Sequence, residues 1–150
     1  MILLSGSSNR PLAQKIAQEM GTTLGKLEST TFANSERRVW ITEEVKGQDI
    51  ALIQSFSEHT DTHIIEFAMI TDALFRAGAR RVFAVNPWFG YSLQDKVFRP
   101  GEPIGAKVVA SMLSSQSIYR FILMNLHNNS ISGFFSVPSS VLSSDDVFIE

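Results

Sequence analysis

A loop that combines aromatic side chains with an amide, a carboxylate and an ammonium group occupies residues 87–96, PWFGYSLQDK. It follows the apolar run RRVFAV, which is typical of a buried strand. The loop is therefore expected at the carboxyl end of a strand, where open α/β sheets bind ligands. Gln94, Asp95 and Lys96 are the polar candidates, and Lys96 offers positive charge to an anionic ligand. The alternative is that all three are solvated loop residues. We expect the apolar part of the loop to form a rigid wall without catalytic residues: Pro87, Trp88, Phe89 and Tyr91.

Two other places offer candidate side chains, although their spacing alone favours a structural interpretation. Phe32, Asn34, Ser35 and Glu36 fall between two short strand-like runs, which is typical of a polar turn beside a strand. His127 follows an apolar run, where a lone histidine is more often structural than a ligand. Mg²⁺ also ordinarily prefers oxygen ligands.

The composition is that of an ordinary globular domain, with 150 residues, 44% hydrophobic and 19% charged. A net charge of −2 argues against a nucleic-acid-binding protein with a basic surface, although a local cluster can still bind a small anion. The absence of cysteine excludes disulfides, thiolate nucleophiles and zinc–thiolate sites. Because no apolar run reaches about 18 residues and no secretory signal opens the chain, we expect a cytoplasmic protein without membrane association.

Alternating strand and helix patterns must position the candidate loops. Apolar runs and turn residues predict strands at 2–5, 27–32, 37–42, 49–55, 80–87 and 119–126, and helices at 11–20, 60–77 and 103–117. This order predicts an α/β fold with a mainly parallel sheet, helices on both faces, and a hairpin or flap near residues 30–42. Beyond residue 126 the pattern weakens into a serine-rich segment without clear periodicity.

The helices should bury the apolar residues that recur at helical spacing. In helix 11–20 these are Leu12, Ile16 and Met20, with Ala13 and Ala17 beside them. In helix 60–77 they are Ile64, Phe67, Ala68, Thr71, Leu74 and Phe75, while His59 and His63 are expected to be solvated. In helix 103–117 they are Ile104, Val108 and Met112, with Ala106, Val109 and Leu113 alongside.

Nearly the whole chain resembles the N-terminal part of ribose-phosphate pyrophosphokinases, the enzymes that make phosphoribosyl pyrophosphate. Matching segments occur in the family's order: MILLSGSSNRPLAQKIA, FANSERRVWITEEVKGQDIALIQS, DTHIIEFAMITDALFRAGARRVFAV, PWFGYSLQDK and NLHNNSISGFF. QDKVFRPGEPI and Asn125 resemble the archaeal-type branch more than the bacterial and animal loop. The resemblance implies a phosphoribosyltransferase-like fold.

The resemblance also implies roles for the candidate residues. Phe32, Asn34, Ser35 and Glu36 match an element that reaches across a subunit interface and stacks an aromatic ring on the adenine of ATP. The ATP contacts of the family's loop correspond to Leu93, Gln94, Asp95 and Lys96, and its magnesium-associated histidine corresponds to His127.

Leu93 departs from the family, which usually has arginine at this position. That loss removes a cation–π contact of about 0.5–2 kcal/mol with the adenine, although leucine can still cover an aromatic face. Arg37, Arg38 and Lys46 are interpreted as surface charge, with an anion patch as the alternative, and Lys46 falls where many members have an arginine linked to regulation.

The activity implied by the resemblance is transfer of the diphosphoryl group of Mg²⁺-ATP to ribose 5-phosphate, giving phosphoribosyl pyrophosphate and AMP for nucleotide biosynthesis. The family's catalytic Lys and Arg flap and its ribose-5-phosphate loop lie in a C-terminal domain. We therefore expect residues 1–145 to form the N-terminal domain and residues 146–150 to begin a linker or second domain. No catalytic residue is expected in this chain, and the isolated chain should be inactive.

The family builds its ATP site between subunits, so we expect a homo-oligomer with shared ATP sites. Two alternatives remain open from the sequence. One is a noncatalytic regulatory or associated subunit of such an enzyme, and the other is a stand-alone nucleotide-binding module.

Overall fold

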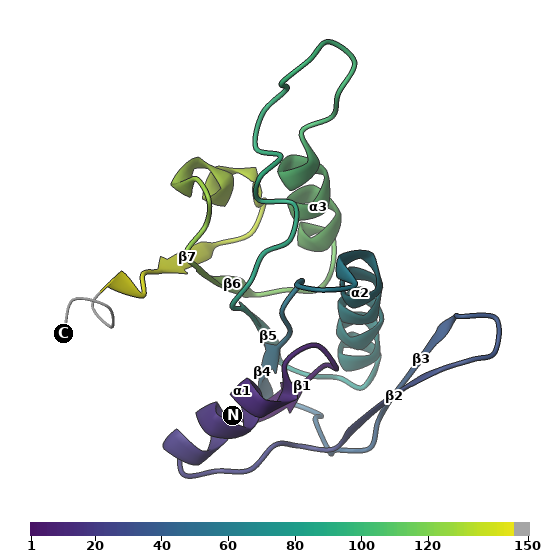
Figure 1. The fold of residues 1–150 in the computed structure, drawn as a ribbon. Helices are drawn as coiled ribbons and strands as arrows, with labels where there is room; N and C mark the ends of the chain where they lie inside the picture. Colours follow the sequence, from purple (N-terminus) through teal and green to yellow (C-terminus); the bar gives the residue numbers. More distant parts are fainter. Residues whose placement is uncertain (146–150) are drawn as a thin grey trace.

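A five-stranded parallel sheet forms the centre of the computed structural model, which describes residues 1–145 (Figure 1). From one edge of the sheet to the other, its strands are β1 (Ile2–Ser5), β4 (Asp49–Ile53), β5 (Arg81–Asn86), β6 (Arg120–Met124) and β7 (Ser139–Leu142). Every neighbouring pair is parallel. The carboxyl ends of the strands therefore meet at one edge of the sheet, and the predicted fold class is confirmed.

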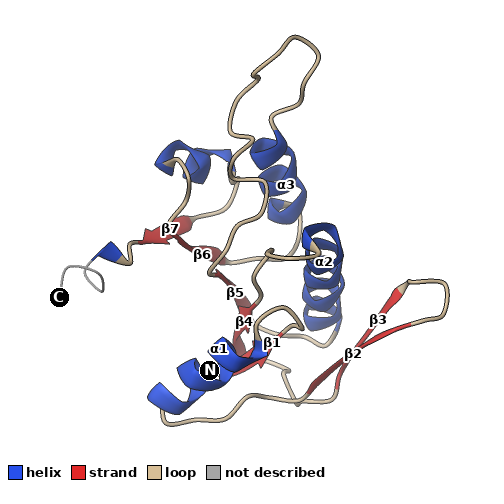
Figure 2. Ribbon diagram, in the orientation of Figure 1, coloured by secondary structure: helices blue, strands red, loops and turns tan. Residues whose placement is uncertain are grey.

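Helices cover both faces of the sheet (Figure 2). On one face, α1 (Arg10–Glu19) packs its alanines against a small cluster that contains Leu3, Ala51 and Ile53. The larger core on the other face lies under α2 (Thr60–Arg76), α3 (Gly105–Ser114) and the 3₁₀ helix η1 (Asn129–Phe134). Since side chains alternate along a strand, the interior strand β4 contributes residues to both clusters and is buried along its whole length.

The predicted hairpin is a separate two-stranded antiparallel sheet of β2 (Leu27–Thr31) and β3 (Arg37–Ile41). Figure 1 shows that it passes α2 and projects away from the body of the domain. Its base is joined to the core because Leu27, Val39 and Ile41 pack against the larger apolar cluster. Its tip, residues 32–36, lies at the far end.

The buried faces of α1 and α3 are centred on the residues predicted beside the main apolar stripes, so the predicted faces are corrected in part. In α3 the buried side chains include Ala106, Val109, Ala110 and Leu113, whereas Val108 is 58% and Met112 is 39% exposed. In α1, Ala13 and Ala17 are buried and Met20 is exposed. Alanines let a helix approach the sheet closely, so the larger residues are displaced to the sides of the contact.

The boundaries of α3 also differ from the prediction of 103–117. Its first helical residue is Gly105, because Pro103 and the extended Ile104 precede it. It ends at Ser114.

The buried side of α2 is wider than the sequence predicted, and two expectations about it were wrong. His63 is 9% exposed although it was expected to be solvated, and Glu66 is fully buried. Phe75, predicted in the core, is 62% exposed near the end of the helix. The reason is that α2 contacts β3 of the hairpin as well as the sheet, so a polar side of the helix is covered.

The serine-rich segment contains η1 and the edge strand β7, neither of which was predicted. In the described part of the chain β7 pairs only with β6, and its side chains are at most half-buried, which leaves little apolar pattern to read. The residues assigned to a linker, 146–150, lie outside the described part of the chain. No helix within residues 1–145 has both the length and the apolar character to cross a membrane.

Candidate ATP and metal site

The loops that follow β5 and β6 meet at the carboxyl edge of the sheet. Leu93 from the first loop and His127 from the second line one cavity of about 280 Å³. The amide Nδ2 of Asn128 donates a hydrogen bond to Oδ2 of Asp95 at 3.1 Å, which joins the two loops directly. The cavity is lined by Pro87, Trp88, Phe89, Ser92, Leu93, Met124, Asn125 and His127. Two of the candidate residues that are far apart in the sequence thus share one cavity.

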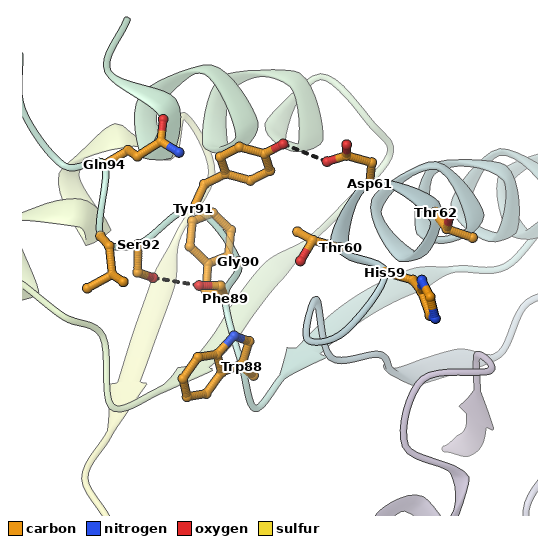
Figure 3. Close-up of a pocket in the computed structure, with 11 residues that line it drawn as sticks. His59, Thr60, Asp61, Thr62, Trp88, Phe89, Gly90, Tyr91, Ser92 and Gln94 are labelled. Carbon is orange, nitrogen blue, oxygen red and sulfur yellow. Dashed lines mark hydrogen bonds between the residues drawn. The ribbon is translucent and has the colours of Figure 1, made fainter. Parts of the chain in front are cut away.

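The first loop is held against the start of α2. Tyr91 has a positive φ of 65°, and its hydroxyl donates a hydrogen bond to Oδ1 of Asp61 at 2.6 Å (Figure 3). This hydrogen bond raises the pKa of Tyr91, and partial burial adds to the effect. At Gly90, a Cβ atom would lie 2.6 Å from the carbonyl oxygen of Phe56, so a larger residue would push the loop away from this contact.

The expected apolar wall is only partly buried. Phe89 is 3% exposed, and its ring centroid lies 6.0 Å from that of Phe56 and 5.4 Å from that of Phe135. Trp88 is instead 63% exposed. It lines the His127 cavity and a larger hollow of about 610 Å³ between residues 59–62 and 88–94 (Figure 3). Trp88 therefore presents an accessible ring surface to both hollows.

The other loop candidates point to different surroundings. Gln94 packs against the start of α3, where a Cβ at Gly105 would lie 2.6 Å from Gln94 Oε1. The ammonium of Lys96 lies 5.2 Å from the ring centroid of Phe98. Gln94 and Lys96 line a hollow of about 580 Å³ together with Phe98, Arg99, Glu102 and Pro103. Asp95 is occupied by its hydrogen bond from Asn128. Leu93 lines the His127 cavity and the 610 Å³ hollow, and Gln94 lines the 610 Å³ and 580 Å³ hollows. Lys96 lines the 580 Å³ hollow, so these loop residues face different hollows although they are close in sequence.

The hairpin candidates form a tight, exposed turn. The backbone N–H of Phe32 donates to Glu36 O at 2.8 Å, and the N–H of Glu36 donates to Asn34 Oδ1 at 3.2 Å. Ser35 has a positive φ of 71°, and the Phe32 side chain is 52% exposed. In Figure 1 this tip points away from the loops that follow β5 and β6. The fold does not bring the hairpin candidates to the cavity of their own chain.

Comparison with known proteins identifies the family. Residues 1–116 match the model of the N-terminal domain of ribose phosphate pyrophosphokinase. The chain belongs to this family. Its fold superimposes with a TM-score of 0.94 on a phosphoribosylpyrophosphate synthetase from Mycobacterium smegmatis, which is 31% identical, and the match covers 98% of this chain and 49% of that one.

Curated relatives give the same assignment. A putative ribose-phosphate pyrophosphokinase 2 from Streptococcus pneumoniae serotype 4 is 42% identical over 138 residues, covering 92% of this chain and 43% of the relative. A ribose-phosphate pyrophosphokinase from Fusobacterium nucleatum is 40% identical over 136 residues, covering 91% and 43%. The chain thus spans less than half the length of these relatives. They are bacterial, so the likeness of residues 94–104 to the archaeal-type branch stays a prediction.

The cavity that contains His127 has few of the side chains that bind metal ions. Within residues 1–145, no three His, Cys, Asp or Glu side chains gather in a way that could hold a metal ion. The polar side chains that line the cavity belong to His127, Asn125, Ser92 and Trp88, without a carboxylate among them. Mg²⁺ favours oxygen ligands and retained waters, and it is commonly shared with substrate phosphates. These residues fit Mg²⁺ only together with a phosphate-bearing ligand.

Sequence reasoning missed several residues around the site of this domain. Thr60, Asp61 and Thr62 line the 610 Å³ hollow, and the signal available for them was their position shortly after a buried strand. Ser8 was also missed: its hydroxyl donates to Gln54 Oε1 at 2.9 Å and accepts from the N–H of Ser55 at 2.8 Å. These contacts fasten the loop after β1 to the end of β4.

Proposed function

We propose that this chain is the N-terminal domain of a ribose-phosphate pyrophosphokinase. The enzyme would transfer the diphosphoryl group of Mg²⁺-ATP to ribose 5-phosphate, giving phosphoribosyl pyrophosphate and AMP for nucleotide biosynthesis in the cytoplasm. The observation that carries the proposal is the single cavity that Leu93 and His127 share at the carboxyl edge of the sheet, in a chain of this family. In this account the domain supplies elements of the ATP site and of the subunit interface.

ATP would bind over the loop that follows β5. Leu93 is 69% exposed and offers its apolar side chain to the adenine, with Gln94, Asp95 and Lys96 beside it. Phosphate oxygens of ATP and His127 would then hold Mg²⁺, which neutralises charge that develops during phosphoryl transfer. The imidazole of His127 would bind through a neutral ring nitrogen, in a cavity whose lining also includes Phe89 and Pro87.

The second face of the adenine would come from another subunit. Phe32 is exposed at the hairpin tip, and this tip points away from the loops that follow β5 and β6 of its own chain (Figure 1). In this arrangement Phe32 is free to stack on a base bound by a neighbouring copy. Aromatic stacking on a base contributes about 1–3 kcal/mol in nucleic-acid systems. We therefore propose a homo-oligomer in which Phe32, Asn34, Ser35 and Glu36 complete the ATP site of a neighbour.

The second candidate function is a noncatalytic subunit that assembles with an active pyrophosphokinase. One residue favours it: Leu93 provides no guanidinium to lie against the adenine. An assembled regulatory subunit would keep the hairpin and the fold while its ATP affinity is weak or absent.

The test is release of AMP from Mg²⁺-ATP that depends on ribose 5-phosphate, measured for the 150-residue chain and for a full-length protein that contains it. We expect turnover of about 1–100 s⁻¹ from the full-length protein, as for kinases, and none from the 150-residue chain. An inactive full-length protein with its fold and oligomer intact would favour the noncatalytic subunit. Turnover at that rate by the 150-residue chain would contradict the assignment of catalysis to the second domain.

A further inference from the structure

A carboxylate is fully buried in the middle of α2. Glu66 is 0% exposed, and its Oε2 accepts hydrogen bonds from Ser7 Oγ at 2.6 Å and from Gln54 Nε2 at 2.8 Å. The backbone N–H of Ser7 also points to this oxygen at 3.4 Å. Burial alone would raise the pKa of Glu66, but hydrogen bonding lowers it below its ordinary value, so the side chain is ionised. One carboxylate oxygen thus joins α2 to the loop after β1 and to the end of β4.

The other carboxylate oxygen of Glu66, Oε1, is buried without a hydrogen-bond donor within residues 1–145. Ser29 Oγ of β2 is also buried without a partner there. Ser29 pairs with Val39 across the hairpin, Val39 packs against the larger apolar core, and α2 contacts β3, so this part of the hairpin covers the helix. Ser29 and Arg37 also favour the ionised form of Glu66. A buried acceptor on α2 and a buried donor on the hairpin therefore lie close together. Rotation of the hydroxyl, or one bridging water, would pair them.

Contacts with α2 are needed to orient the hairpin relative to the rest of the domain. Within residues 1–145, β2 and β3 pair only with each other and form no ladder with the five-stranded sheet. An isolated two-stranded hairpin is marginally stable in water, so packing against α2 must hold it. The apolar contacts of Leu27, Val39 and Ile41 hold its base but are not directional, whereas a hydrogen bond to a buried carboxylate is.

We propose that Glu66 is a positioning residue for the hairpin: through Ser29 it fixes the angle at which β2 and β3 leave the domain. Ser7 and Gln54 hold the carboxylate in turn, so the hairpin is coupled to the carboxyl edge of the sheet. The consequence for ATP rests on the proposed function, in which the hairpin tip carries Phe32 to a neighbouring subunit. Glu66 would then act on ATP binding without touching ATP.

Hydrogen–deuterium exchange of the 150-residue chain tests the positioning role without any ligand. Glu66→Ala and Ser29→Ala should each speed exchange of hairpin amides 27–41 by about tenfold or more, while β4, β5 and β6 change by less than about twofold. Glu28→Ala and Thr30→Ala are the matched controls, because both side chains are exposed on β2, and they should leave the hairpin unchanged. Glu66→Gln should restore slow exchange, since its amide can accept from Ser7 and donate to Ser29.

Unchanged hairpin exchange in Ser29→Ala would overturn the proposal. So would a rise in Glu66→Ala that is equal in the hairpin and in the central strands, because that outcome reports a loss of global stability only. Ser29→Ala removes a single oxygen, so it keeps the test decisive even where Glu66→Ala fails to fold.

Titration of the full-length protein with ATP separates this proposal from the proposed function. Glu66→Ala should raise the dissociation constant of ATP by about tenfold and leave kcat and the KM for ribose 5-phosphate within about twofold. If the unmodified protein binds no ATP, the proposed function fails and hydrogen exchange alone decides the positioning role. If the hairpin is loosened while ATP affinity is unchanged, the link from Glu66 to ATP binding is overturned.

Discussion

The hydroxyl of Tyr91 donates a hydrogen bond to Asp61 Oδ1 at 2.6 Å, and this contact ties the loop after β5 to the first turn of α2. Both residues line the surface between the two elements, and Tyr91 adopts a positive φ to make the contact. The contact therefore holds this part of the loop, shortly before Leu93 and Gln94, against the start of α2.

Removal of this hydroxyl should loosen the loop with little loss of stability. Because the pair is exposed, we expect Tyr91→Phe to cost less than about 1 kcal/mol of unfolding free energy. The pKa of Tyr91 is raised above its ordinary value, so the contribution is present below about pH 10 and is lost as pH rises through the folded-state pKa. Thermal unfolding from pH 8 to 11 should show the difference between Tyr91→Phe and the unmodified chain vanishing at the alkaline end. Asp61→Asn is the control, and a difference that persists above that pKa would contradict the assignment.

An ion-pair cluster at the opposite edge of the sheet should govern acid stability. Asp49 accepts hydrogen bonds from the guanidinium groups of Arg81 and Arg80, with Arg80 Nη2 at 2.6 Å, and these bonds hold the pKa of Asp49 well below its usual range. A lowered folded-state pKa contributes stability above the unfolded pKa near 4, and this is lost as pH falls further. Asp49→Asn should therefore lower the melting temperature at pH 7 by a few degrees and flatten its fall below pH 4.

Asp49→Asn also serves as a control for the site. Asp49 begins β4 and Arg81 begins β5, so the cluster lies at the amino ends of the strands. ATP affinity should be unaffected by Asp49→Asn. A melting temperature that is unchanged at pH 7 would contradict the role given to the cluster.

The role of His127 can be separated from a structural one by metal dependence. If it binds Mg²⁺ together with ATP phosphates, His127→Ala in the full-length protein should raise the Mg²⁺ concentration needed for half-maximal activity by about tenfold or more. Fold stability should hardly change, because His127 lies at the surface of a cavity. A magnesium titration beside thermal unfolding decides the matter. A large drop in melting temperature with unaltered metal dependence would identify a structural histidine.

The alternation of strands and helices was predictable because each central strand is a short apolar run between turn residues. Short apolar runs of this kind, alternating with helical segments, are typical of buried parallel strands. The same logic placed the loop at 87–96 and His127 at the carboxyl edge of the sheet. The sequence pattern did not predict that Leu93 and His127 line the same cavity, because this depends on the paths of two irregular loops.

The failures share a cause, which is contact between elements that the local pattern does not report. His63 and Glu66 are polar residues on α2, yet the hairpin covers them. Burial lowers the pKa of His63, which keeps the imidazole neutral beneath the hairpin. The edge strand β7 was not predicted because it begins with two serines and has little apolar pattern. An edge strand with one neighbouring strand needs little apolar surface.

The most direct test of the central claim is calorimetric titration of the assembled full-length protein with ATP, before and after Leu93→Arg. If Leu93 is one wall of an adenine pocket and Phe32 from a neighbour is the other, the unmodified protein binds ATP and Leu93→Arg adds a cation–π face. We expect Leu93→Arg to tighten ATP binding by about 0.5–2 kcal/mol, or about two- to thirty-fold in dissociation constant. Phe32→Ala should weaken binding in both backgrounds. Absence of detectable ATP binding by both proteins, with the oligomer intact, would contradict the account.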